Sequence, residues 1–321
     1  MTSQPTADPI TVQAADEQVH DPGADSDPLW SESHYLDTVS PDAGSGAYVR
    51  LGRLPNQRRS HIMLAIVRPG TGPVILTVPD APMPDVSGAD LAVQAPGYDL
   101  ALTLEAPVQR LRVTAHGTAT AYDDPADALR QPGHHAGRDV GFELDLSWTT
   151  EGPSHLWRQT TRYEIPCHVT GSVRVDGERI DVDWAGQRDH SWGPRDWWAF
   201  SWCWMAVHLD DGSRWHAAAI PAFPGVGMGS FSRAGVLTEI TTITASSDLT
   251  PAGLFGDTLE SVDPGGHQLA LSPVSFAPVR MDAADGRVSF FPRATCRVSA
   301  ADGRTGVGWL EWNLPQEPPA P

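Results

Sequence analysis

Hydrophobic residues along this chain recur mainly at every second position. Between residues 142 and 148, apolar side chains occupy the even positions and polar ones the odd positions, and residues 111–115 repeat the pattern. A period of two predicts β-strands that have one buried and one solvated face. Only residues 124–130 look capable of a short helical turn. The sequence therefore predicts an all-β protein.

Turn signals separate these segments at regular intervals. Asp-Gly dipeptides occur at 176–177, 211–212, 285–286 and 302–303, each between two apolar runs. Such dipeptides favour tight hairpins between antiparallel strands. Antiparallel strands joined in sequence close readily into barrels, which remove free edges and can enclose an apolar cavity.

The length of 321 residues suits two domains of ordinary size. We expect two consecutive antiparallel β-barrel or sandwich domains, covering residues 28–183 and 184–314. Residues 1–27 are rich in acidic residues, proline and glycine, and residues 315–321 are rich in proline. Neither end has enough apolar surface to order itself, so both are predicted to be disordered tails.

Charge and composition exclude several classes of protein. The net charge is -18 and no basic stripe occurs, which argues against a nucleic-acid partner. No apolar stretch is long enough to span a membrane. Cys167, Cys203 and Cys296 lie far apart, so neither a disulfide framework nor a cysteine zinc site is indicated, and a cytoplasmic location fits. The chain contains no phosphate loop or dinucleotide fingerprint, so no cofactor is expected.

Tryptophan is concentrated in one segment. Of the twelve tryptophans, seven fall within residues 184–215, where even scatter would place about one. They are Trp184, Trp192, Trp197, Trp198, Trp202, Trp204 and Trp215. Indole offers a large flat apolar surface with a negative π face, which suits a pocket for apolar ligands. Any function of the protein is expected to reside here.

Alternation within this segment defines a strand with two apolar faces. One face would carry Trp198, Phe200, Trp202, Trp204 and His208. The opposite face is also apolar, so the strand should be covered on both sides, as at a junction between domains. The wide aromatic side chains are either packed core or the wall of a pocket, and the sequence leaves both interpretations open.

A polar motif, GQRDHSWGPRD at 186–196, adjoins the aromatic wall. Its ion pairs could simply fix the crossover between the domains. Alternatively, Asp189 and His190 form an acid/base pair that Arg188 or Arg195 holds in place, beside Trp192. Two further histidines, His208 and His216, flank a hairpin but lack the carboxylates that would complete a metal shell, so no metal site is predicted. In the apolar run 307–312, Glu311 is expected to point toward a cavity.

The motif at 186–195 resembles the two-domain lipocalin-like family that contains the carotenoid 1,2-hydratases, also called hydroxyneurosporene synthases, together with uncharacterised actinobacterial members. Residues 30–35, 48–52 and 306–311 support the resemblance. It implies two lipocalin-like β domains, an apolar pocket near their junction, an isoprenoid-, polyene- or lipid-like ligand and mostly no cofactor. The hydratases combine a His-x-Trp pair with a later Tyr-x-Asp pair. Here the first matches His190 and Trp192, whereas the second is missing.

Two functions from different classes follow from these patterns. The first is a cofactor-independent enzyme that hydrates, isomerises or cyclises an apolar isoprenoid- or polyene-like substrate by acid/base chemistry in a tryptophan-lined pocket. The second is a non-catalytic lipocalin-like carrier for a hydrophobic small molecule. Either protein would have a hydrophobic small molecule as its partner, and weak association with a membrane surface could assist access to it.

Overall fold

The computed structural model describes residues 10–23, 26–131, 137–223, 227–262, 267–283 and 285–316. The predicted all-β class is confirmed, because the described residues form two large antiparallel sheets and only short 3₁₀ helices. The helices are η1 (Ala14–Glu17), η2 (Pro55–Gln57) and η3 (Pro125–Leu129). The last of these confirms the predicted helical turn at 124–130. None of the helices in the described segments has the length and apolar character that a membrane crossing requires.

The strands divide between the sheets in chain order. The first sheet contains β1 (Trp30–Val39), β2 (Gly46–Leu54), β3 (Arg59–Val67), β4 (Val74–Ala81), β5 (Asp85–Ser87), β6 (Asp90–Ala95), β7 (Tyr98–Ala106), β8 (Arg110–Tyr122), β9 (Gly137–Thr150), β10 (His155–Leu156), β11 (Arg162–Val175) and β12 (Glu178–Pro194). The second part of the chain supplies β13 (Trp202–Leu209), β14 (Arg214–Ala219), β15 (Gly227–Arg233), β16 (Val236–Ile240), β17 (Thr244–Leu249), β18 (Phe255–Val262), β19 (Gln268–Phe276), β20 (Val279–Asp282), β21 (Val288–Phe291), β22 (Arg293–Ala300) and β23 (Thr305–Gln316).

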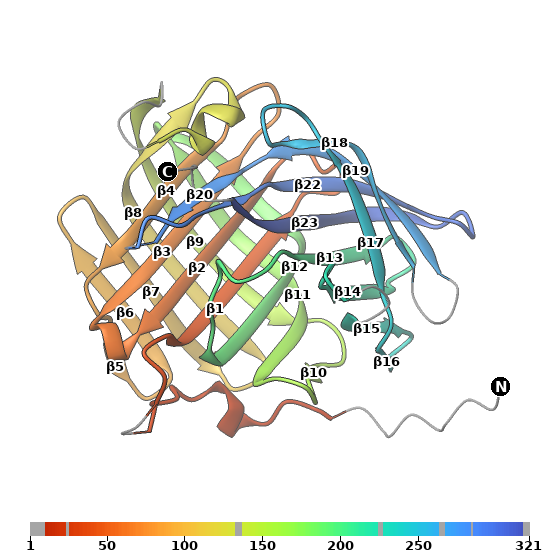
Figure 1. Cartoon of the computed structure of the whole chain (residues 1–321), viewed down its shortest axis with the longest axis horizontal. Coiled ribbons are helices and arrows are strands. Elements are labelled where there is room, and N and C mark those ends of the chain that lie inside the picture. Colours follow the sequence, from red (N-terminus) through yellow and green to blue (C-terminus); the bar gives the residue numbers. More distant parts are fainter. Residues whose placement is uncertain are drawn as a thin grey trace.

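The first sheet closes on itself. Pairings run β1–β2–β3–β4–β8–β9–β11–β12 and return to β1, and β7, β6 and β5 extend from β8. Figure 1 shows the tilted strands of this barrel on the left. Its interior is a packed core that includes Leu51, Leu64 and Leu146. Trp148 is fully buried there, and its indole Nε1 donates to the backbone oxygen of Asp37 at 2.7 Å.

The second sheet lies beside the barrel. Its strand order is β16–β15–β14–β13–β23–β22–β19–β18–β17, and a β20–β21 hairpin is attached through β23. One face of β13 carries Cys203, Met205 and Val207 into the core of this sheet, while Trp204 and Ala206 face the barrel. Both faces of β13 are thus covered, as its two apolar faces predict.

Hairpins occur where the Asp-Gly dipeptides predict them. Asp176 and Gly177 join β11 to β12 with φ values of 50° and 81°. Positive φ at both central residues is the geometry of the type I′ turn, whose twist matches that of the flanking strands. The other three dipeptides fall in the β13–β14, β20–β21 and β22–β23 connections.

Aromatic packing and hydrogen bonds join the barrel to the second sheet. Trp309 is 1% exposed, and its ring meets that of Tyr48 edge-on with 5.6 Å between centroids. Its indole Nε1 also donates to the backbone oxygen of Thr38 at 3.0 Å. A second bond, from Thr295 Oγ1 to Ala43 O at 2.7 Å, crosses the same junction.

The boundary between the barrel and the second sheet lies further along the chain than the sequence predicts. The predicted division at residue 184 falls inside β12, which stays paired with β1 and β11 as far as residue 191 or beyond. Residues 195–201 then cross to β13. The polar motif therefore belongs to the barrel, because its backbone is hydrogen-bonded there on both sides.

Residues 10–23 also depart from the sequence prediction. The sequence predicts a disordered tail at residues 1–27, but Val12 is buried in the barrel core and Glu17 is 2% exposed. Glu17 is held by an ion pair with Arg188. Composition does not predict this, because the segment is ordered by contacts with residues far along the chain. The predicted disorder at 1–9 and 317–321 falls on residues outside the described ones, and residues 315–316 complete β23.

Candidate active site at the junction of the two sheets

Strand β12 separates two groups of polar residues, because successive side chains on a strand point to opposite faces. Arg188, His190 and Trp192 point into the end of the barrel. Asp189 and Ser191 point outward, toward the second sheet, where they line a cavity. The sequence motif thus contributes to two sites with different surroundings.

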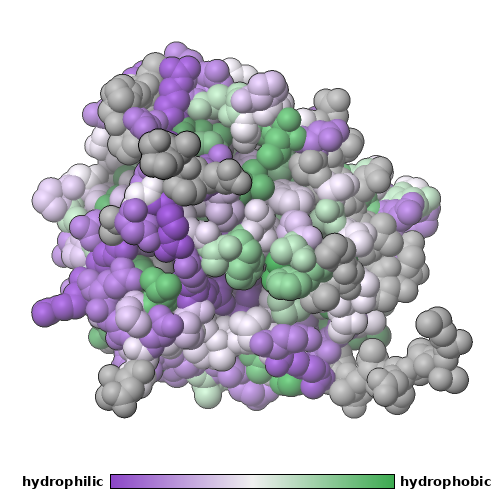
Figure 2. Space-filling view, viewed as in Figure 1, coloured by the Kyte–Doolittle hydropathy of each residue, from purple (hydrophilic) through white to green (hydrophobic). Residues whose placement is uncertain are grey.

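The outward site is a cavity of about 310 Å³ between the barrel and the second sheet. Its walls come from β1, β2, β11 and β12 on one side and from β13, β14, β15, β22 and β23 on the other, and the crossover 195–201 forms part of its rim. This volume lies at the lower end of the range for small-molecule sites. In Figure 2, hydrophobic side chains gather near the middle of the visible face, where Figure 1 shows β12 giving way to β13.

Aromatic side chains make up much of the cavity wall. Trp202 and Trp204 come from β13, Phe200 comes from the crossover, and Trp157 lies on the opposite side. Tyr35 from β1 meets Trp204 edge-on with 5.0 Å between ring centroids. A ligand in the cavity would therefore contact mainly apolar and aromatic surface.

A carboxyl group of the barrel faces this apolar space. Asp189 is 6% exposed, and its Oδ2 accepts a hydrogen bond from Arg162 Nη2 at 2.5 Å. Its Oδ1 has no hydrogen-bond partner among the described residues. Burial raises the pKa of Asp189, although the charges of Arg162, Arg195 and Arg50 oppose the change.

Behind Asp189 lies a second buried carboxyl, that of Glu164. Its Oε1 accepts from Arg162 Nε at 2.7 Å, and its Oε2 accepts from Gln187 Nε2 at 2.9 Å. Burial raises the pKa of Glu164 to about 7, against the opposing charge of Arg162. His216 Nε2 lies 3.2 Å from Glu164 Oε1. His216 therefore packs against Glu164, and it does not line the cavity.

Four arginines line the cavity, and their partners differ. Arg162 pairs with Asp189 and with Glu164, and Arg293 of β22 pairs with Glu311 of β23. The side chains of Arg50 and Arg195 form no hydrogen bond or ion pair with the part of the chain that is described. Burial lowers the pKa of Arg50 to about 9 and that of Arg195 to about 10. Neighbouring arginines add to both effects, and the negative charge of Asp189 opposes them.

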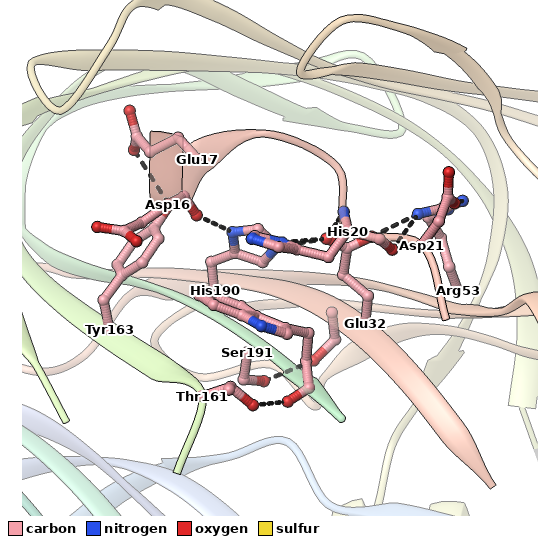
Figure 3. A network of polar contacts seen from close by, with 12 residues as sticks. Asp16, Glu17, His20, Asp21, Glu32, Arg53, Thr161, Tyr163, His190 and Ser191 are labelled. Carbon is pink, nitrogen blue, oxygen red and sulfur yellow. Dashed lines mark hydrogen bonds and ion pairs between the residues drawn. The ribbon is translucent and has the colours of Figure 1, made fainter. Parts of the chain in front are cut away.

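The inward group closes the end of the barrel around Glu32 (Figure 3). Glu32 Oε1 lies 3.0 Å from His20 Nδ1 and 2.9 Å from His190 Nε2, and its other oxygen pairs with Arg53. The ring of His190 also stacks on His34 at 3.9 Å between centroids. Burial would raise the pKa of Glu32, but its hydrogen bonds to His190 and His20 outweigh this effect and lower the pKa.

The ligand atoms of His20, Glu32 and His190 lie within 4.8 Å of one another, which is close enough to hold a metal ion. Glu32 is already neutralised by Arg53 and hydrogen-bonded to both histidines. A cation here would have to displace these bonds next to a fixed guanidinium, which opposes it electrostatically. The trio is better explained as a hydrogen-bond network that anchors the segment 10–23.

The structure divides the site residues that the sequence singled out. Those that line the junction cavity are Asp189, Arg195, Phe200, Trp202, Trp204 and Glu311. Those that point into the barrel are Arg188, His190 and Trp192, so the expected pairing of Asp189 with His190 does not form. The remaining three, Trp198, His208 and His216, lie outside the cavity lining. Trp198 donates to the backbone of Met281, and His208 is buried near Arg214.

Sequence reasoning missed several residues of the cavity. Tyr35, Arg50, Arg162 and Arg293 lie on strands far from the motif and reach it only through the closure of the barrel and the docking of the second sheet. One signal was available. Arg50 is a lone charge within the apolar stretch 47–51, and a charge in an otherwise buried strand generally marks a paired or functional group.

Comparison with known proteins identifies the family of the chain. A family model described as a domain of unknown function, DUF7064, matches residues 13–316, and the chain belongs to this family. A search of curated proteins gives no match.

Solved structures show the same fold at low identity. A putative AttH from Nitrosomonas europaea superposes with a TM-score of 0.59 at 14% identity, covering 88% of this chain and 92% of the other. Kievitone hydratase from Nectria haematococca gives 0.58 at 11% identity, with 95% and 93% covered. CghA, solved with Sch210972, gives 0.57 at 12% identity, with 90% and 89% covered. These likenesses establish the lipocalin-like fold, and at such identities they establish nothing more.

Proposed function

We propose that this protein is an enzyme that hydrates, isomerises or cyclises an apolar small molecule in the junction cavity by acid/base chemistry. The position of Asp189 carries the proposal. Its carboxyl lies at the wall of an aromatic cavity, one oxygen is held by Arg162, and the other has no hydrogen-bond partner among the described residues. A carboxyl with a raised pKa can give a proton to an apolar substrate and take one back.

The surrounding groups suit that role. Arg162 fixes the orientation of Asp189 and stabilises its carboxylate after proton transfer. The indoles of Trp202 and Trp204 present π faces that stabilise positive charge developing on a protonated alkene or carbonyl. Removal of a positioned acid typically costs a factor of roughly 10²–10⁴ in rate.

The substrate is proposed to be isoprenoid- or polyene-like, with about 10 to 20 carbons. A body of that size would bury enough apolar surface, at roughly 25 cal/mol per Å², to bind without many polar contacts. The likeness of residues 186–195 to the carotenoid hydratases supports hydration, and so does the name of kievitone hydratase, which shares the fold. The motif histidine, His190, would act as a structural residue here, because it faces the barrel interior.

The alternative is a carrier that holds its ligand without changing it. The Arg162–Asp189 and Arg293–Glu311 pairs favour this function, since each links neighbouring strands within one sheet and so has a structural role without catalysis. The two functions differ in whether the ligand leaves the cavity altered.

Comparative mass spectrometry tests the proposal. The purified protein is incubated with a lipophilic small-molecule extract, in parallel with Asp189→Asn and with Asp181→Asn, an exposed carboxylate on the same strand. Wild type and Asp181→Asn should convert one compound to a product that has gained or lost water or has an unchanged mass and a new retention time. Asp189→Asn should leave it unconverted. Retention of an unaltered compound by all three proteins would establish the carrier instead.

A further inference from the structure

Arg50 is a buried cation that faces the junction cavity without a partner. It is 6% exposed, and its Nη1 is enclosed without a hydrogen bond among the described residues. Its Cζ lies 4.1 Å from the ring centroid of Trp197, and the negative π face of this ring partly stabilises the buried charge. The chain also leaves space for it, since a Cβ at Gly52 would lie 2.6 Å from Nη1.

Arg195 is a second unpartnered cation in the same cavity. It follows β12 at the start of the crossover, and its side chain makes no hydrogen bond or ion pair within the described segments. The other two cavity arginines each have a carboxylate partner, since Arg162 pairs with Asp189 and Glu164 and Arg293 pairs with Glu311. Two of the four guanidinium groups in the cavity thus have no carboxylate partner among the described residues, although the whole chain carries a net charge of -18.

Unpaired guanidinium groups in an apolar cavity cost folding free energy, and the cost is offset when an anion binds between them. We propose that the cavity binds an amphipathic organic acid, with a carboxylate or acidic enolate held between Arg50 and Arg195. The inference rests on the proposed function, because it names the substrate class of the same cavity. Such a planar monoanion matches the donor fork of arginine.

The remaining lining sets the other half of the ligand. Beyond the arginines and the carboxylates Asp189, Asp196 and Glu311, the wall consists largely of aromatic and aliphatic side chains such as Trp202, Trp204 and Met228. A sugar phosphate or nucleotide would leave its hydroxyl groups against these surfaces without hydrogen bonds. The ligand therefore combines one anionic group with an apolar body. Binding of the anionic group by the two arginines places the apolar body beside Asp189.

Three probes with the same chain length test the charge preference: dodecanoate, dodecan-1-ol and dodecylamine. Each is titrated below its micelle concentration into the full-length protein, and binding is followed by tryptophan emission and calorimetry. A charge-assisted hydrogen bond should make dodecanoate bind at least about tenfold more tightly than the alcohol. The amine should bind most weakly because the charges of Arg50 and Arg195 repel an ammonium group.

Variants then locate the anionic group. Arg50→Met and Arg195→Met should each weaken dodecanoate binding roughly tenfold and leave the affinity for dodecan-1-ol nearly unchanged. Arg297→Met, which alters an exposed arginine on β22, should change neither. In the ligand-free protein Arg50→Met should keep or raise the melting temperature, because it removes an unpaired buried charge, whereas a structural role would lower it.

The outcomes separate the two proposals. If dodecanoate and the alcohol bind equally well, or if both variants keep full affinity for dodecanoate, the anionic subsite is wrong and the apolar cavity of the proposed function stands. If none of the probes binds, the proposed function and the subsite both fail. Should Arg50→Met not fold, Arg195→Met still decides the question, since Arg195 lies on the crossover outside the paired strands.

Discussion

Asp189 and His190 are neighbours in β12 whose side chains serve different sites. Asp189 faces the junction cavity, where its Oδ2 lies 2.5 Å from Arg162 Nη2. His190 faces the barrel interior, where its Nε2 lies 2.9 Å from Glu32 Oε1. Substitutions at these two adjacent positions should therefore affect different properties, catalysis at the first and stability at the second.

Replacing Asp189 with asparagine should remove the proton donor while keeping the shape of the side chain. Once a substrate is identified, we expect turnover to fall by roughly 10²–10⁴-fold in steady-state kinetics. Arg162 keeps its ion pair with Glu164, so the melting temperature should change little. Asp181→Asn, on an exposed stretch of the same strand, should retain full activity. Equal turnover by both variants would contradict the assignment.

Glu17→Gln tests whether the segment 10–23 contributes to the fold. The substitution leaves Arg188, which is 2% exposed, without its charged partner. Breaking a buried pair from one side should lower the free energy of unfolding by about 3–5 kcal/mol, as measured by urea denaturation. Asp21→Asn in the same segment removes an exposed partner of Arg53 and should cost no more than about 1 kcal/mol. Similar losses for the two variants would show that Glu17 is not a special anchor.

Trp309→Ala should weaken the junction between the barrel and the second sheet. It removes a ring that is 1% exposed, together with the hydrogen bond to Thr38 O and the contact with Tyr48. We expect a loss of about 3–5 kcal/mol in denaturation followed by far-UV circular dichroism. Phe200→Ala, at a side chain that is 44% exposed, should cost under about 1 kcal/mol. A small effect at Trp309 would mean that the sheets are held together elsewhere.

The buried carboxyl of Glu164 should make stability depend on pH. Burial raises its pKa from 4.5 to about 7, so between these values the folded protein binds more protons than the unfolded chain. Stability contributed by this group is then lost as the pH rises through that window. Buried histidines act in the opposite direction, since burial lowers the pKa of His61 and His208 to about 3.

A comparison of variants isolates this effect. Urea midpoints of wild type and Glu164→Gln are measured from about pH 5 to pH 8. The wild type should lose stability relative to the variant as the pH rises. Glu143→Gln, which changes an exposed carboxylate, should follow the wild type. Parallel curves for wild type and Glu164→Gln would show that Glu164 does not carry the proton.

The local elements of the fold could be predicted from the sequence. Alternation over 142–148 and 111–115 defined β9 and β8, and the Asp-Gly dipeptide at 176–177 defined the turn between β11 and β12. These features depend on residues close along the chain, so a period of two and a preference for positive φ suffice to predict them. The all-β class and the covered faces of β13 follow from the same local information.

Which residues share a site could not be predicted from the sequence, because it depends on long-range strand pairing. The extension of β12 to Pro194 depends on pairing with β1, and this pairing fixes which face of the strand each motif residue occupies. Arg50 reaches the cavity because the barrel closes and the second sheet docks against its outer face. Glu17 is ordered by Arg188, 171 positions away in the sequence. Long-range pairings and buried charge pairs leave no periodic signal in the sequence, because each depends on a partner that folding alone brings close.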